Sequence, residues 1–162
     1  AWIFLWHYRF VGASVIAMLA LLASLLVVYA QLRRQPPVSG LQRVIVDGTF
    51  SLYLGWITTA TFANLGAWFF AIGDWPFSLT MDEWAIVTVV LATGIYIAAG
   101  MWTADAVYPV VFAWAALGIV YRPSGVIEAV RLAAATGVAA VAAVTLLSIG
   151  RSLFGRRRSV LG

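Results

Sequence analysis

Long apolar runs alternate with short polar stretches along the whole 162-residue chain. A helix needs about 20 apolar residues to cross a hydrocarbon core that is ~30 Å thick. The pattern predicts five such helices, over residues 10–30, 49–73, 84–101, 106–121 and 126–150, and the first can begin as early as residue 1. These runs are apolar on every side, whereas the strands of a membrane barrel alternate apolar and polar residues. We therefore predict an all-α, polytopic transmembrane bundle of about five helices, folded as a single transmembrane domain.

Turn residues and capping residues mark the ends of the predicted helices. Pro36 and Pro37 lie in the first connection, where a pair of prolines stops a helix. Thr80 is followed three residues later by Glu83, which is the pattern of a capping box at the start of the third helix.

The composition agrees with a membrane protein and excludes other classes. Hydrophobic residues make up 64% of the chain and charged residues 10%, whereas soluble domains carry about 25% charged residues. A water-soluble globular enzyme is therefore excluded. The chain has no cysteine, which rules out disulfides and thiolate chemistry. The net charge of +4 comes from arginines between the apolar runs, so we expect the lipid bilayer, and no nucleic acid, as the partner.

Loop charge predicts the orientation of the bundle. The first connection carries Arg33, Arg34 and Arg43, and the segment after residue 150 is also rich in arginine. Excess arginine marks the cytoplasmic side of a membrane, and five spans place these two segments on the same side. We therefore predict that the N-terminus lies outside and the C-terminus lies in the cytoplasm.

Asn64 is the clearest polar residue inside a predicted span, and its amide needs partners in hydrocarbon. It belongs to a set of residues that recur every four positions and are expected to share one helix face. Small residues between the indoles would leave a gap that suits a flat aromatic ligand. The ligand-binding candidates are Tyr53, Trp56, Ala60, Asn64 and Trp68.

Helix packing is the alternative explanation of the same segment. Gly55, Thr59 and Ala63 have the small-residue spacing of a packing seam, with Asn64 bonded to a second helix. A similar row of small residues in the last span predicts close approach within the bundle or to a partner, and it consists of Ala129, Ala133 and Gly137.

Other residues with functional chemistry are few. His7 is the only histidine, and it is either an axial ligand to a haem or chlorophyll or part of an interfacial aromatic cluster. Asp105 and Glu128 lie near span ends, and Arg131 has the spacing for a local ion pair with Glu128. The sequence holds no Ser/His/Asp set, no HExxH motif and no phosphate loop, so we predict no catalytic residues, no firm metal ligand and no enzyme activity.

Residues 51–64, with Tyr53, Leu54, Trp56, Ala60 and Asn64, resemble the fourth helix of the TspO/MBR family of tryptophan-rich sensory or translocator proteins. That helix reads approximately P-Y-L-x-W-V-x-x-A-x-x-L-N. The opening Trp-Ile-Phe-Leu-Trp-His-Tyr is similar to the start of the family's third helix. The resemblance covers residues 1–73, and residues 74–162 would form the C-terminal helical extension of long bacterial members.

The resemblance implies a fold, a location and ligands. Family members are five-helix bundles, often dimeric, that bind tetrapyrroles and sterol-like ligands. A bacterial inner-membrane protein is implied, with Trp56, Ala60 and Asn64 facing the ligand cavity and a porphyrin, haem or chlorophyll-type pigment as cofactor. The family's first two helices, with the W-x-P-P loop that closes over the ligand, have no counterpart in this sequence. The pocket is half built if the protein lacks them, and the family's ligand site is expected in full if they precede residue 1.

Two functions are consistent with these observations. The first is a tryptophan-rich sensory protein that binds a tetrapyrrole or similar hydrophobic ligand as sensor or carrier, alone or as a homodimer. The second is a non-catalytic accessory subunit of a larger membrane complex for pigment binding or electron transfer.

Overall fold

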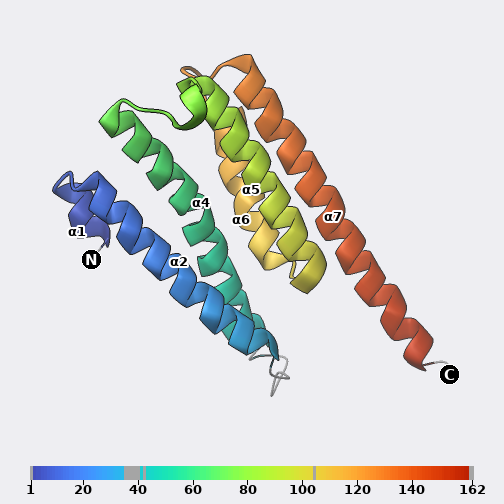
Figure 1. The fold of residues 1–162 in the computed structure, drawn as a ribbon. Coiled ribbons are helices and arrows are strands. Elements are labelled where there is room, and N and C mark those ends of the chain that lie inside the picture. The colour runs from blue at the N-terminus through green and yellow to red at the C-terminus, as the bar shows by residue number, and fades with distance from the viewer. Residues whose placement is uncertain (1, 35–40, 42, 104, 161–162) are drawn as a thin grey trace. The chain divides into compact units, whose positions relative to one another are not determined.

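The computed structural model describes residues 2–34, 41, 43–103 and 105–160, and this part of the chain is helical almost throughout (Figure 1). The described elements are α1 (Trp2–His7), α2 (Val11–Arg34), the π-helical turn η1 (Arg43–Asp47), α4 (Gly48–Ile72), the 3-10 turn η2 (Pro76–Ser78), α5 (Met81–Thr103), α6 (Val107–Val120) and α7 (Glu128–Val160). No strand occurs among the described residues, which confirms the all-α prediction. Pro36 and Pro37 lie outside the described residues.

The membrane-crossing potential differs among these helices. Within the described residues, three helices are long and apolar enough to cross a bilayer, namely α2, α5 and α7 from Glu128 to Leu147. Helix α6 has 14 residues and reaches only about 21 Å at 1.5 Å per residue. Helix α4 is 25 residues long, but its threonines, glycines and Asn64 lower its mean hydropathy. The prediction of a helical membrane bundle is confirmed. Helix α4 is less apolar, and helix α6 is shorter, than a typical membrane-crossing helix.

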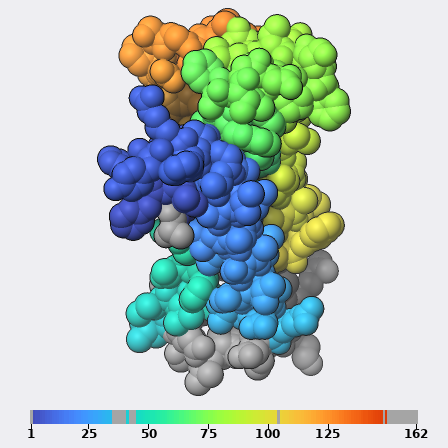
Figure 2. Space-filling view, turned by 60° about the vertical axis from the view of Figure 1, so that its left-hand side comes forward, coloured from blue at the N-terminus to red at the C-terminus, as the bar shows by residue number. Residues whose placement is uncertain are grey.

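The chain divides into two compact units, Ala1–Thr88 and Val89–Gly162, and α5 runs across the division. In the first unit α2 packs along α4, and α1 folds back beside the first turns of α2 (Figure 1). Figure 2 shows the dark-blue side chains of α1 on the surface next to α2. The buried side of α2 has the spacing of one helix face, with Ser14, Val15, Met18 and Leu25.

A sharp turn at Arg9 separates α1 from α2, so the prediction of one helix beginning at residue 1 is wrong. Arg9 has a φ of 63°, in the left-handed region. The N–H of Arg9 donates to the carbonyl of Trp6 at 3.1 Å, and the N–H of Phe10 donates to that of Leu5 at 2.9 Å. This pair of bonds is the Schellman motif that ends a helix.

Helix α5 begins with the predicted capping box. The N–H of Thr80 donates to Glu83 Oε2 at 2.8 Å, and the N–H of Glu83 donates back to Thr80 Oγ1 at 3.3 Å. Both bonds satisfy donors that the first helical turn leaves without partners, so this prediction is confirmed.

In the second unit α6 packs along α7 around an aromatic core. Tyr96 stacks on Tyr108 with 4.5 Å between ring centroids, and Phe112 lies 5.2 Å from Tyr96. The α7 face that packs inward consists of Val130, Ala134, Gly137 and Val141.

The seam predicted from Ala129, Ala133 and Gly137 is therefore only partly correct. Gly137 is buried, whereas Ala129 is exposed and Ala133 is half-buried. A spacing of four drifts around a helix of 3.6 residues per turn, and the packed face follows steps of four and three. Helix α7 also continues to Val160, past the predicted end at residue 150.

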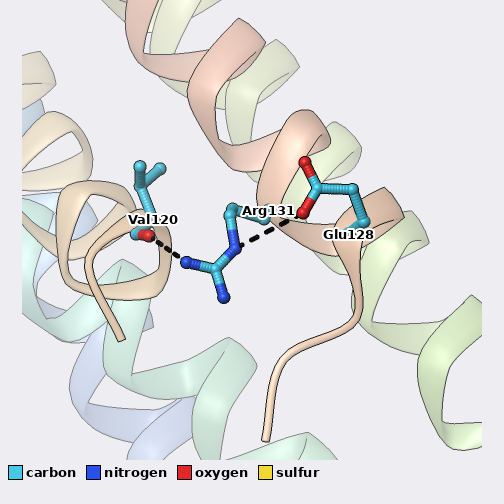
Figure 3. Close-up of polar contacts among 3 residues, drawn as sticks. All are labelled: Val120, Glu128 and Arg131. Carbon is cyan, nitrogen blue, oxygen red and sulfur yellow. Dashed lines mark hydrogen bonds and ion pairs between the residues drawn. The ribbon is translucent and has the colours of Figure 1, made fainter. Parts of the chain in front are cut away.

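Arg131 ties the start of α7 to the end of α6 (Figure 3). Its Nη1 donates to the carbonyl oxygen of Val120 at 2.7 Å, and its Nε lies 3.7 Å from Glu128 Oε2. The second contact confirms the predicted ion pair. The first satisfies one of the carbonyls that a helix end leaves free, and no spacing rule indicates it.

We expect Gly137→Ala to destabilise the second unit by about 1–3 kcal/mol, because a packed core accepts an added methyl group poorly. A Cβ at this position would lie 2.6 Å from Thr93 Oγ1 and 3.2 Å from Phe112 Cζ. Gly118→Ala is the matched control, since a Cβ there meets nothing within 4 Å. Thermal unfolding in detergent measures both variants, and equal stability of the two would contradict this packing.

We expect Arg131→Met to cost about 1.5–3 kcal/mol, because it removes a charged donor from the Val120 carbonyl. The Glu128 side chain is 88% exposed, so Glu128→Gln should cost less than about 0.5 kcal/mol. Unfolding curves of the two variants separate the contributions. A loss for Glu128→Gln as large as that for Arg131→Met would show that the ion pair, and not the helix end, is the important contact.

Candidate functional site

All five predicted ligand-binding residues lie on α4, but the structure does not gather them on one face. Tyr53 and Trp56 are 44% and 46% exposed, whereas Asn64 is only 3% exposed. Ala60 and Trp68 are half-buried. Each step of four residues advances about 40° beyond a full helical turn, so the set winds around α4. The prediction of a shared face is therefore wrong, while the assignment of these residues to a ligand stays a prediction.

Asn64 is the polar centre of the α2–α4 contact. Ser14 Oγ, on α2, lies 3.1 Å from Asn64 Oδ1 and 2.6 Å from the carbonyl oxygen of Val11. A serine hydroxyl carries one proton, so it donates fully to only one of these two oxygens.

The other half of the Asn64 amide lacks a partner. Its Nδ2 is buried and has no hydrogen-bond partner in the part of the chain that the structure describes. Turning the amide over would let the NH₂ group donate to Ser14 and would leave the oxygen unpaired instead. An unpaired buried polar group costs about 1–3 kcal/mol, so this amide favours any group that completes its hydrogen bonds.

Hydroxyl groups continue the buried polar face along α4. Thr58 Oγ1 donates to the Leu54 carbonyl at 2.8 Å, and Thr61 Oγ1 donates to the Ile57 carbonyl at 2.7 Å. Ser51 Oγ bonds the carbonyl of Asp47 in the same way. These hydroxyl protons are used within the helix, and Ser51 Oγ also accepts from Arg33 Nη2 at 3.5 Å. The four-residue spacing from Asn64 does not include this row, although intervals of three and seven residues connect its members to Asn64.

The structure changes the predicted packing seam on α4. Gly55 is buried and Thr59 is half-buried, but Ala63 is exposed. The prediction that Gly55, Thr59 and Ala63 form a continuous packing seam is therefore wrong, because residues spaced by four drift around the helix. The expected bond from Asn64 to a second helix is present, through Ser14.

Aromatic rings enclose the end of α4 where Trp68 lies. The Trp68 indole lies over Gly12 of α2, where a Cβ would come within 3.2 Å of Nε1. Phe69 contacts the Trp68 ring at 5.4 Å and meets the Trp84 ring edge-on at 4.9 Å, as centroid distances. Its ring also lies 6.1 Å from that of Trp75. Trp68 thus packs between helices, and Trp56 lies about three turns away along α4.

The remaining candidates occupy separate places. His7 is exposed at the end of α1, edge-on to Tyr8 at 5.3 Å between centroids. No group of three or more His, Asp or Glu side chains gathers in the described residues in a way that could hold a metal. Axial ligation by His7 stays a prediction.

Asp105 is more buried than we expected from its predicted position near the end of a span. It is 6% exposed, and its Oδ1 accepts hydrogen bonds from the N–H groups of Val107 at 2.9 Å and Tyr108 at 3.4 Å. A carboxylate in this position satisfies the first donors of α6 and interacts favourably with the helix dipole. These two hydrogen bonds are those of a helix cap.

We expect Ser14 and Asn64 to be energetically coupled by about 0.6 kcal/mol, and by at most ~1.7 kcal/mol, as measured for hydrogen bonds between membrane helices. A double-mutant cycle of Ser14→Ala and Asn64→Leu, followed by unfolding in detergent, gives this value. Ser24→Ala is the matched control, because Ser24 Oγ bonds the Ala20 carbonyl of its own helix. A coupling with Asn64→Leu as large for Ser24 as for Ser14 would contradict the contact.

Comparison with known proteins identifies the family of this chain. A family model described as TSPO-like protein matches residues 1–147. This match confirms the resemblance drawn from the Trp56, Ala60 and Asn64 spacing, and it continues beyond residue 73, where the resemblance was expected to end. The predicted division at that residue stays a prediction. No curated protein and no solved structure matches the chain. From the match over most of its length, the chain belongs to the family of TSPO-like proteins.

Proposed function

We propose that this membrane protein binds a flat hydrophobic ligand of the tetrapyrrole class, such as a porphyrin, a haem or a chlorophyll-type pigment, and acts as its sensor or carrier. The observation that carries the proposal is the Asn64 amide, which is buried with one half unpaired. A carbonyl or carboxylate of the ligand would accept from this amide, or a ligand donor would serve its oxygen. Membership of a family of TSPO-like proteins supports a ligand-binding role in the membrane.

The exposed aromatic residues of α4 supply the second part of the proposed site. Trp56 and Tyr53 present large ring surfaces, and aromatic rings prefer offset stacking against flat partners. Trp56 lies eight residues before Asn64, which is about 12 Å along the helix axis. The small side chain of Ala60 separates them. A ligand that reaches both would stack its ring on Trp56 and direct a polar substituent around the helix towards Asn64.

The same groups do not favour catalysis. The side chains around Asn64 are hydroxyls, indoles and aliphatic groups, which bind and orient a ligand but neither withdraw nor supply protons at neutral pH. We therefore propose a binding protein and no enzyme.

The proposed location is the bacterial inner membrane, with the N-terminus outside and the C-terminus in the cytoplasm. Arg33 and Arg34 support this orientation, because they end α2 and arginine next to a span favours the cytoplasmic side. At the opposite end of the first unit, Asp74, Asp82 and Glu83 give the connection to α5 an acidic character.

We expect the purified protein in detergent to bind haem or protoporphyrin, with quenching of tryptophan fluorescence as the readout. Trp56→Leu should weaken binding about tenfold, which corresponds to the ~1–1.5 kcal/mol of an aromatic stacking contact. Asn64→Leu should weaken it by a similar factor, because the ligand then loses a buried hydrogen bond.

Matched controls separate a lost site from a damaged fold. Trp102→Leu removes an indole that is 88% exposed on α5, and it should leave the affinity unchanged. Circular dichroism confirms that each variant keeps its helices. Unchanged affinity in both Trp56→Leu and Asn64→Leu would contradict the assigned site, and absence of binding by the unmodified chain would favour the accessory-subunit function, which co-purification at fixed stoichiometry then tests.

A further inference from the structure

The turn between α1 and α2 has an arginine where glycine would be easier to accommodate. Arg9 takes the left-handed conformation at the end of α1, the position that glycine most often occupies in a Schellman motif. A side chain in this conformation costs roughly 1–2 kcal/mol. The arginine therefore does not stabilise the backbone of this turn, and its side chain is a candidate for binding a partner.

That side chain is accessible and unpaired within the chain. The Arg9 side chain is exposed, and in the described segments its guanidinium makes no hydrogen bond or ion pair. In the acidic connection before α5, Glu83 accepts from both the N–H and the hydroxyl of Thr80. Arg9 thus offers five free N–H donors in a planar fork.

The position of α2 places this guanidinium at the membrane surface. Helix α2 is a candidate membrane span that begins at Val11, two residues after Arg9. Its 24 residues extend about 36 Å, which exceeds the ~30 Å hydrocarbon core. The tip of the α1–α2 turn therefore lies at the level of the lipid headgroups.

Exposed aromatic side chains surround the tip. Trp6, Tyr8 and Phe10 are 43%, 68% and 63% exposed, and Trp and Tyr are the residues that concentrate at the membrane–water interface. Figure 2 shows this dark-blue end of the chain at the surface. A cation between aromatic rings matches a lipid molecule, whose headgroup is polar and whose chains are apolar.

We propose that Arg9 binds the phosphate of a membrane phospholipid, with the acyl chains lying along Trp6 and Phe10. The guanidinium fork matches two phosphate oxygens. This site involves α1 and the start of α2, so it is independent of the ligand proposed at Trp56 and Asn64. It also explains why an arginine persists in a backbone conformation that glycine would adopt without strain.

The test is thermal unfolding of the full chain in maltoside detergent with added lipid. Phosphatidylglycerol should raise the midpoint by several degrees, whereas diacylglycerol with the same acyl chains and inorganic phosphate at the same concentration should not. Arg9→Gly should raise the midpoint without lipid, because the strain is relieved, and should lose the response to phosphatidylglycerol. Arg9→Gln keeps the backbone strain and loses the charge. It should therefore lose the response to phosphatidylglycerol, and its midpoint without lipid should not rise.

Two further variants complete the design. Arg9→Lys keeps a cation and should retain part of the response. Arg122→Gln removes another exposed arginine at a turn and should retain all of it. Native mass spectrometry should show about tenfold less phosphatidylglycerol retained on Arg9→Gln than on the unmodified chain. The proposal is overturned if Arg9→Gly and Arg9→Gln respond to phosphatidylglycerol as the unmodified chain does, or if diacylglycerol or inorganic phosphate gives the same shift.

Discussion

Hydrogen bonding of buried polar groups without water is the constraint on which this structure depends. In hydrocarbon each backbone N–H and C=O needs a partner within the protein, and helices provide one at every residue. Side-chain hydroxyls follow the same rule here. Thr58, Thr61, Thr93 and Thr145 each donate to the carbonyl one turn earlier in their own helix. Polar residues are therefore tolerated on packed faces, and the α2–α4 contact is partly polar.

Asn64 has one of the buried polar atoms that lack a partner among the described residues, and this atom gives the candidate site its chemistry. A carboxamide has both a donor and an acceptor end, and the single hydroxyl of Ser14 satisfies only one of them. Ser14 lies at the Oδ1 end, and the Nδ2 donor has no acceptor among the described residues. An additional polar group that completes the hydrogen bonds of Asn64 would therefore be favoured.

Close approach of helices is the second determinant of the architecture. Lipid tails are as apolar as leucine, so helices associate through van der Waals contact and a few hydrogen bonds. Gly137 lets α7 approach Phe112 and Thr93, and Gly12 lets α2 approach the Trp68 indole. In the first unit this approach brings Ser14 to Asn64, so the site depends on the packing of an indole more than one turn away from it. In the second unit the small residues of α7 pack against residues of α5 and α6 that belong to the same unit.

Local interactions were the features that could be predicted from the sequence. The helical class, the capping box of Thr80 and Glu83 and the ion pair of Glu128 with Arg131 all depend on residues at most four positions apart. Their geometry is a property of one helical turn, so spacing alone indicates them. The break at Arg9 escaped prediction because arginine carries no signal for a left-handed turn, whereas glycine would have.

The packing of helices that are distant in the sequence decided the remaining features of the fold and the candidate site. A repeat of four residues predicted one face for Trp56, Asn64 and Trp68, but helical drift and the position of α2 bury Asn64 and leave Trp56 exposed. The enclosure of Asp105 and the bond from Arg131 to the end of α6 likewise depend on which helices meet. The sequence by itself determined that this chain forms apolar helices in a membrane, because hydropathy and local hydrogen bonding act within single segments. Only the tertiary structure decided which polar groups find partners, because a hydrogen bond between helices exists only where the backbones come close enough for the side chains to touch.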